Sequence, residues 1–170
     1  EVAALRDYLD RGGALMIALE PSFGRLRPKL APGSEDALVE LLAALGLRLE
    51  NGVVASEIAT QPVFHDKLDR ANILTNRYAV HPAAETLMKT KPSDPLLFLQ
   101  AGWLVELSER ERPARALPAK RTAVVRSLDV VWGDRNGNLD FDAGLESRGT
   151  LDLVYAVAGE GEASFRAMVF

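Results

Sequence analysis

The sequence predicts an α/β domain: a Rossmann-like or flavodoxin-like three-layer sandwich with a mainly parallel sheet and extra short strands. The first observation is the continuous apolar run Ala14–Leu19, which follows a helical pattern and a glycine pair. Such a run suits a strand buried on both faces, as in a parallel sheet covered by helices. The second is a further unit of helix and strand at residues 34–56, which resembles the first.

The spacing of apolar residues and the positions of glycine and proline predict the elements of the first third. Val2, Leu5, Tyr8 and Leu9 recur at helical spacing before Gly12 and Gly13. Prolines and glycines make residues 21–33 a loop that leaves the carboxyl end of the first strand. Ser34 caps the next helix, whose apolar stripe ends at Gly46, and residues 47–56 read as a strand segment with a turn at Asn51–Gly52. The stripe consists of Leu38, Leu41, Leu42 and Leu45.

The rest of the chain predicts mainly strands. Short β-branched and aromatic runs occupy residues 62–65, 73–80 and 96–107, with one or two helical turns at 82–88. Residues 108–120 hold three arginines and two prolines and predict a mobile surface loop. Three final strands are expected at 123–132, 151–158 and 165–170, and a tight Gly159–Glu162 connection joins the last two.

Composition excludes several classes of function. A length of 170 residues fits one domain, and we expect residues 1–170 to be a single α/β domain excised from a longer membrane-anchored protein. The net charge of −4 argues against nucleic acid as a partner. With no cysteine, the chain has no disulfide, thiolate metal site or cysteine nucleophile. Its apolar runs are shorter than the roughly 20 residues that span a bilayer.

An acidic stretch after the strand that ends at Trp132 is the one candidate metal site. Carboxylates and amides alternate with other residues, and Gly137 permits a sharp turn, as calcium loops require. The pattern departs from an EF-hand because glycine stands fourth and no glutamate stands twelfth. A plain turn, whose side chains bond their own backbone, is the alternative. The candidate calcium ligands are Asp134, Asn136, Asn138, Asp140 and Asp142.

The loop after the first strand is a candidate ligand site. Open α/β sheets bind ligands beyond the carboxyl ends of their strands, and Glu20, Ser22 and Arg25 lie there. An ordinary solvated connection is the alternative. His65 and His81 lack the spacing of a metal site or triad and are expected to be structural or exposed. Trp103, Trp132 and Phe98 suit a core better than a sugar-stacking platform.

Several ordered motifs resemble the GldG-like auxiliary component of ABC-type transport systems, a family first associated with gliding motility. Matching segments are Leu5–Pro21, Leu38–Val54, Tyr78–Pro82 and Phe98–Ala101. A further match runs from Trp132-Gly133-Asp134 through Phe141-Asp142, Glu146 and Gly149 to Leu151–Val157, with Thr150 where the family usually has proline. The resemblance covers nearly the whole chain.

The resemblance implies a class I glutamine amidotransferase-like, flavodoxin-type fold and a periplasmic, extracytoplasmic location at a bacterial inner membrane. The membrane anchors would lie outside this chain, and ABC transporter membrane or auxiliary subunits, with glycan as a further candidate, would be the partners. Amidotransferase activity is not implied, because the nucleophilic cysteine is absent.

The function that the sequence favours is therefore a non-enzymatic extracytoplasmic binding or scaffolding domain of an ABC transporter auxiliary protein. A metal-dependent hydrolase or transferase that uses the acidic loop 134–142 is a second hypothesis. A small-ligand sensor for a sugar or nucleotide is a third. No cofactor is expected apart from the candidate calcium ion.

Overall fold

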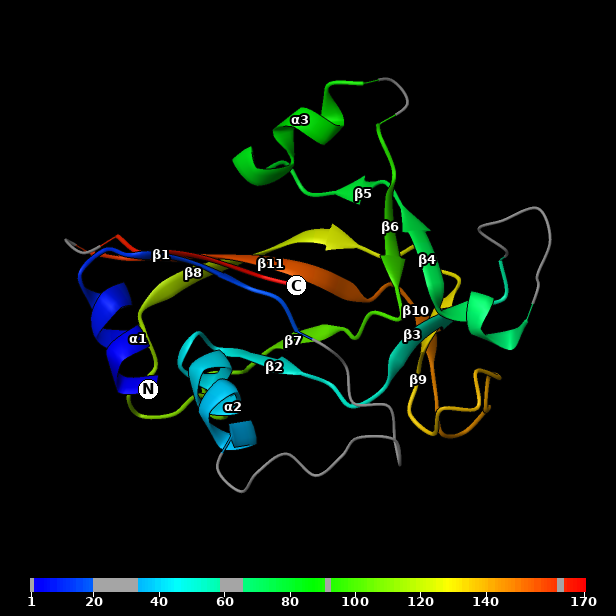
Figure 1. Ribbon diagram of the computed structural model, residues 1–170, viewed down its shortest axis with the longest axis horizontal. Coiled ribbons are helices and arrows are strands. Elements are labelled where there is room, and N and C mark those ends of the chain that lie inside the picture. The colour runs from blue at the N-terminus through cyan, green and yellow to red at the C-terminus, as the bar shows by residue number, and fades with distance from the viewer. Residues whose placement is uncertain (1, 20–33, 59–65, 91–92, 162–163) are drawn as a thin grey trace.

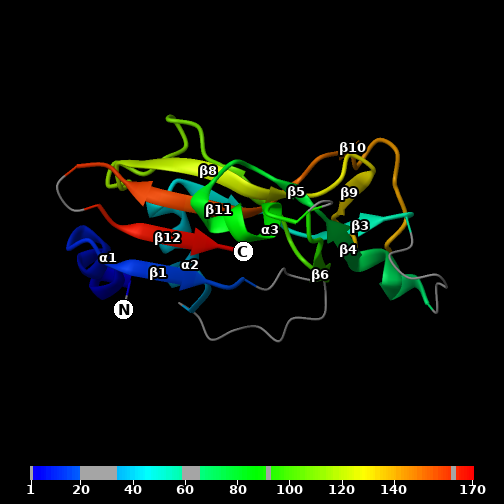
Figure 2. The ribbon, with the colours of Figure 1, turned by 90° about the horizontal axis from the view of Figure 1, so that it is seen from above.

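The computed structural model describes residues 2–19, 34–58, 66–90, 93–161 and 164–170. It is mostly β, with a large mixed sheet that carries two helices against one face (Figure 1) and two smaller sheets at one end (Figure 2). The predicted Rossmann-like or flavodoxin-like sandwich with a mainly parallel sheet is wrong. Of the strand pairs in the described part of the chain, only β1 with β12 is parallel, and every other pair is antiparallel.

The large sheet has seven strands in the order β1-β12-β11-β7-β2, with β8 also paired to β11 and β5 paired to β8. Its strands are β1 (Ala14–Ile17), β2 (Leu47–Leu49), β5 (Arg77–Tyr78), β7 (Leu104–Glu106), β8 (Ala119–Arg126), β11 (Asp152–Gly159) and β12 (Arg166–Val169).

The antiparallel pairing follows from short connections. Six residues separate β11 from β12, whereas a parallel pair needs a crossover of a dozen residues or more. The predicted tight connection after Gly159 was therefore already incompatible with a mainly parallel sheet. The predicted strand 123–132 is two strands, since β8 ends at Arg126 and β9 begins at Val131 in another sheet.

Helices α1 (Val2–Asp10) and α2 (Ser34–Ala44) occupy the positions that their apolar spacing predicts and pack on the same face of the large sheet (Figure 1). Burial of apolar side chains between helices and sheet supplies the main stabilising free energy of this layer. The core beneath the helices combines Leu9, Leu41, Leu42 and Leu45 with Ile17, Leu47, Leu104, Ala123, Tyr155, Val157, Ala167 and Val169 from the strands.

Strand β1 is an edge strand, so it is not buried on both faces as its continuous apolar run predicts. Leu15, Ile17 and Leu19 pack toward the helices, whereas Met16, on the other face, is 68% exposed. The odd-numbered residues also carry the pairing with β12, because the Gly13 carbonyl accepts from Arg166 N and the Ile17 carbonyl accepts from Phe170 N, just after β12. The backbone N–H and C=O groups of the even-numbered residues therefore point away from β12, toward the open edge of the sheet.

The side chain of Tyr8 lies beside the outward-pointing backbone groups of Ala14. Its hydroxyl donates to the carbonyl of Ala14 and accepts from the N–H of the same residue, each at 3.2 Å. The ring covers Gly13, where a Cβ atom would lie 2.4 Å from the Tyr8 Cε1 atom. Helix α1 thus closes part of the edge that β1 leaves unpaired.

The opposite face of the large sheet is partly covered by the middle of the chain. There the turn η3 (Pro82–Ala84) leads into α3 (Glu85–Met88), as the sequence predicts. Figure 1 shows α3 on the side of the sheet away from α1 and α2. The second core under this segment contains Ile73, Ala84, Val124, Val125, Leu153, Val154 and Ala156, with Tyr78, Met88, Leu96 and Met168 packed against it.

The two smaller sheets lie beside the large one. One consists of β3 (Val53–Ser56), β9 (Val131–Asp134) and β10 (Arg148–Gly149), and the other of β4 (Asn72–Thr75) and β6 (Leu96–Leu99). The turn η2 (Lys67–Ala71) precedes β4. The predicted strand segment 47–56 is thus divided at Gly52 between two sheets. No helix in the described ranges is long and apolar enough to cross a membrane.

Arg121 joins the end of α2 to the large sheet. Its guanidinium donates to the carbonyls of Leu45 at 2.5 Å, Ala119 at 2.8 Å and Leu117 at 3.2 Å. A cation at a helix C-terminus satisfies carbonyls that have no partner within the helix. Burial lowers the pKa of this guanidinium, although an arginine stays charged.

Replacing Gly46 by alanine tests this junction. Gly46 has φ of 75°, and a Cβ atom there would lie 2.3 Å from Arg121 Nε. We expect Gly46→Ala to lower the free energy of unfolding by about 2–3 kcal/mol, measured by urea titration, because backbone strain adds to displacement of the guanidinium. Gly12→Ala is the matched control, since Gly12 has φ of 80° and open space around its Cβ position. Its expected cost is about 1 kcal/mol, and an equal loss of stability in the two variants would contradict a role for the Arg121 contact.

Candidate functional site

The acidic stretch forms a compact loop between β9 and β10. Strand β9 delivers Asp134 to the buried end of the loop, where its side chain is 1% exposed. The neighbouring strand end approaches so closely that a Cβ atom on Gly52 would lie 2.1 Å from the carbonyl oxygen of Asp134. The position is therefore fixed by backbone packing before any side chain of the loop contributes.

The carboxylate of Asp134 organises the first half of the loop. Its Oδ1 atom accepts from the N–H groups of Asn136 at 3.1 Å and Gly137 at 3.0 Å, and Oδ2 accepts from Leu139 at 2.8 Å. These bonds hold Gly137 at φ of 76° and Leu139 at φ of 58°, a conformation that leucine rarely adopts. Leu139 is buried in the small core beside Trp132.

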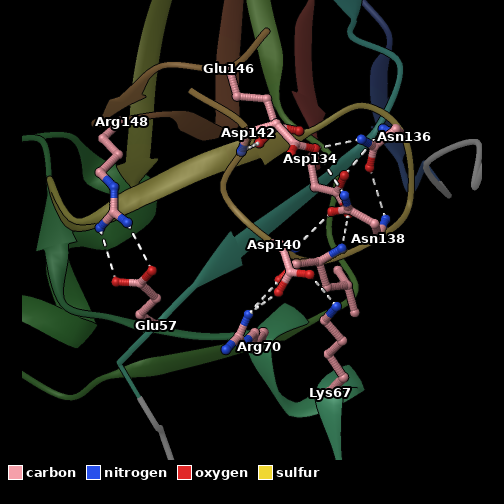
Figure 3. Close-up of polar contacts among 11 residues, drawn as sticks. Glu57, Lys67, Arg70, Asp134, Asn136, Asn138, Asp140, Asp142, Glu146 and Arg148 are labelled. Atoms are coloured by element: carbon pink, nitrogen blue, oxygen red, sulfur yellow. Dashed lines mark hydrogen bonds and ion pairs between the residues drawn. The ribbon is translucent and has the colours of Figure 1, made fainter. Parts of the chain in front are cut away.

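The two asparagines and Asp142 close the loop from the other side (Figure 3). Asn136 Nδ2 donates to Asp142 Oδ2 at 2.6 Å, and Asn138 Nδ2 donates to the same oxygen at 2.9 Å. The amide oxygens accept from the backbone two residues on, since Asn136 Oδ1 bonds Asn138 N and Asn138 Oδ1 bonds Asp140 N. The loop is thus built from successive side-chain turns onto its own backbone.

Glu146 is a second buried carboxylate that the candidate list from the sequence omits. It is 8% exposed, and its two oxygens accept from Arg135 N at 3.2 Å and Asp142 N at 3.0 Å. Glu146 therefore ties both ends of the loop together. The sequence gives no signal for this role, because nothing in the residues beside Glu146 indicates that its side chain is buried.

Asp140 points away from the other carboxylates toward η2. It forms ion pairs with Lys67 and with Arg70, at 2.6 Å from Arg70 Nη1, which also donates to Leu139 O at 3.0 Å. The hydrogen bond from Lys67 lowers the pKa of the Asp140 carboxyl. Of the five predicted ligands, the structure gathers Asp134, Asn136, Asn138 and Asp142 in the loop and directs Asp140 outward (Figure 3).

A cation and two aromatic rings complete the neighbourhood. The Arg148 guanidinium lies 4.5 Å from the ring centre of Phe141 and 5.5 Å from that of Trp132. It binds Glu57 through two hydrogen bonds, at 2.9 and 3.2 Å. This bidentate pair joins β10 to the end of β3 and is a charge-assisted contact of specific geometry.

The chemistry available to this loop is therefore mainly structural. Asp134 and Glu146 already accept backbone N–H groups with all four carboxylate oxygens, so a cation would compete with bonds that define the loop. Within the described ranges, no group of three or more Asp, Glu or His side chains is arranged to hold a metal ion. Calcium at Asp134, Asn136, Asn138, Asp140 and Asp142 stays a prediction.

The other predicted sites lie elsewhere. Glu20, Ser22, Arg25 and His65 are outside the described residues. His81 caps η3, where its Nδ1 atom accepts from Ala83 N at 3.1 Å, which agrees with the structural role expected of it. Trp103 and Trp132 are buried, at 6% and 0% exposure, and belong to cores as predicted.

Comparisons with known proteins give one structural neighbour. No family model and no curated protein matches the chain. The solved structure of the mmIFT52 N-terminal domain is similar at a TM-score of 0.57 and 13% sequence identity. The match covers 99% of this chain and 57% of that chain. At this identity the similarity shows the fold alone.

Removing the Asp134 carboxylate should unfold the loop. We expect Asp134→Ala to lower the free energy of unfolding by about 2–4 kcal/mol, because three backbone N–H groups lose their acceptor. Asp140→Ala, on the exposed side, should cost much less. Chemical denaturation with added calcium and with chelator measures both variants. A loss for Asp134→Ala that appears only with calcium would identify the loop as a metal site instead.

The Glu57 carboxyl should titrate below its usual range, because the hydrogen bond from Arg148 lowers its pKa. A carboxyl with a depressed folded-state pKa stabilises the fold above its unfolded pKa, and this contribution is lost as pH falls through the folded pKa. Carboxyl NMR titration of the wild type and of Arg148→Gln measures the shift. The variant should return the Glu57 pKa toward its ordinary value, and an unchanged pKa would refute the pairing.

Proposed function

We propose that this chain is a non-enzymatic binding and scaffolding domain that works through contacts with other proteins. The observation that carries the proposal is a leucine face on the β4–β6 sheet. Contiguous apolar patches on a protein surface mark sites of association when they are large. The face is formed by Leu74, Leu97 and Leu99, which are 39%, 51% and 66% exposed.

Strand register explains why these leucines share one face. Leu74 lies directly opposite Leu97, and Asn72 lies opposite Leu99, two positions along. Ile73 and Phe98, on the alternate face, pack into the second core. A two-stranded sheet with apolar residues on both faces is expected to have one face against its own domain and the other available to a partner.

A shallow groove continues from the leucine face toward the large sheet. Its walls include Leu99, Phe98, Leu49, Leu19 and Phe170, and its volume is about 340 Å³. Gln100 on the rim has φ of 52°, and its N–H donates to Ala71 O at 2.8 Å, which fixes the turn after β6. Fixed backbone around an apolar groove favours a binding surface that is formed before its partner arrives.

Structural roles of the acidic residues weigh against the hydrolase or transferase hypothesis. General acid–base chemistry needs carboxylates that face a shared substrate position. In the loop 134–142, Asp134 faces backbone N–H groups, Asp140 faces η2 and Asp142 faces two amide groups. The sensor hypothesis depends on Glu20, Ser22 and Arg25, and no observation on the described residues favours it.

The resemblance to GldG-like proteins supplies the proposed setting. It implies a domain on the extracytoplasmic face of a bacterial inner membrane, beside ABC transporter membrane or auxiliary subunits. The ordered motifs of the sequence support this setting, and the similarity to the mmIFT52 N-terminal domain bears only on the fold. The proposed partners of the leucine face are therefore those subunits.

Site-specific photo-crosslinking in the native host tests the proposal. A photoreactive residue at position 99 should give a covalent adduct that mass spectrometry identifies as a transporter subunit. The same residue at position 145 is the control, because Leu145 is 75% exposed but lies on the acidic loop. Leu97→Ser with Leu99→Ser should remove the adduct while leaving the unfolding midpoint nearly unchanged, since both side chains are exposed. Absence of adducts at position 99, or equal adducts at both positions, would refute this function.

A further inference from the structure

A second apolar surface lies on the large sheet, on the face opposite α1 and α2. Figure 2 shows the strands β8, β11, β12 and β1 side by side there, with α3 over only one part. We call the uncovered part the bare face, and it consists of Ala14, Met16, Lys120, Ala158, Arg166 and Met168. It shares no residue with the leucine face, so it needs its own explanation.

Strand pairing orders the bare face into two rows. In the first row Met16 pairs with Met168, and the same row continues beyond the bare face to Ala156 of the second core and to Thr122. The second row, two residues further along the strands, runs Ala14, Arg166, Ala158 and Lys120. Within the bare face the first row therefore presents two methionines, and the second alternates alanine with a cation. Residues two apart on a strand lie about 7 Å apart, so both rows are within reach of one helix.

Six of the eight residues in the two rows line a hollow, and Lys120 and Thr122 are not among them. Its volume is about 680 Å³, and His81, Pro82 and Ala83 of η3 make one wall. Small alanine side chains beside two methionines leave room for the side chains of a partner, and methionine adapts to different partner shapes. Met16 is 68% exposed in spite of its apolar side chain.

The charged residues of the bare face are both basic. Arg166 and Lys120 form no ion pair with any described residue, and among the described residues that line the hollow none carries a carboxylate. Since Nδ1 of His81 accepts a hydrogen bond, its other ring nitrogen is a donor as well. Apolar surface bordered by donors and cations is complementary to an apolar partner with carboxylates at its border.

The shape of the surface favours a helix over an added strand. The outward backbone groups of Ala14 are already bonded to Tyr8, so the edge of β1 has few free N–H and C=O groups with which an added strand could pair. The same sheet carries α1 and α2 on its other face, which shows that its curvature accepts helices. Helices usually cover both faces of an α/β sheet, and an uncovered apolar face is the exception.

We propose that the bare face docks a partner helix whose apolar stripe covers Met16 and Met168 and whose acidic side chains pair with Arg166 and Lys120. The inference deepens the proposed scaffolding function and rests on it, but it uses a different surface. The partner class is thus an amphipathic acidic helix of another protein.

Selection of helical peptides tests the proposal directly. A phage library of helical peptides with randomised surface positions is selected on the 170-residue chain and, in parallel, on the variant Arg166→Glu with Lys120→Glu. Wild-type binders should share leucine-like residues at helical spacing flanked by Asp and Glu. The variant should select Lys and Arg at those flanks instead, because the sign of the surface has been reversed. Failure to obtain binders, or the same flanking charges in both selections, would overturn the proposal.

One selected peptide is then measured by fluorescence anisotropy. Charge reversal at Arg166 and Lys120 should weaken its binding by about tenfold or more, and Met16→Glu should do so as well. Arg110→Glu, at an exposed arginine between β7 and β8, is the matched control and should leave binding unchanged. Thermal unfolding of each variant shows whether the fold is intact, and an intact variant with unaltered affinity would count against the bare face.

Two further measurements distinguish a partner helix on the bare face from binding at the leucine face and from a dimer of this chain. Leu97→Ser with Leu99→Ser should not alter peptide affinity, so loss of crosslinks at position 99 and loss of peptide binding are independent failures. Sedimentation of the wild type should give a monomer. A dimer that Met16→Glu converts into monomers would mean that a second copy of the chain covers the bare face, and the proposal of a partner helix would be wrong.

Discussion

Backbone pairing along β11 is the constraint on which the rest of the structure depends. One edge of this strand bonds β8 over its length, and β12 and β7 share the other edge. Its side chains alternate between the two cores, with Tyr155 and Val157 toward α1 and α2 and Val154 and Ala156 toward the middle segment. Both layers of the domain therefore need the same strand in the same register, since a slip of one residue would exchange the two sets.

Away from this strand, polar side chains supply the hydrogen-bond partners that backbone groups find in helices and sheets elsewhere. The carboxylates of Asp134 and Glu146 replace the ladder partners that the loop between β9 and β10 lacks, and Arg121 replaces those missing at the end of α2. A buried charge is costly unless several hydrogen bonds compensate it, and each of these groups has at least two. Charged residues thus have local, directional roles in this domain, which explains how an acidic stretch can resemble a metal site.

Local features were predictable from the sequence, whereas the pairing of strands was not. Helical spacing and the glycines after residues 10 and 44 locate α1 and α2 correctly. The run Ala14–Leu19 was misleading because an apolar face without a partner has the same composition as a buried one. Division of residues 47–56 between two sheets depends on contacts with β7 and β9, more than 50 residues away, which no local pattern encodes. The acidic loop was predictable in position, but the inward role of Glu146 and the outward role of Asp140 required the fold.

The bond between Tyr8 and Ala14 has a consequence for how the protein behaves in concentrated solution. An open sheet edge is a template on which other chains can assemble, and natural proteins obstruct such edges. Among the described residues the obstruction is the phenol hydroxyl of Tyr8 from the adjacent helix. Colloidal stability of the domain is thereby coupled to the docking of α1: when this short helix frays, the edge opens, and self-association competes with refolding.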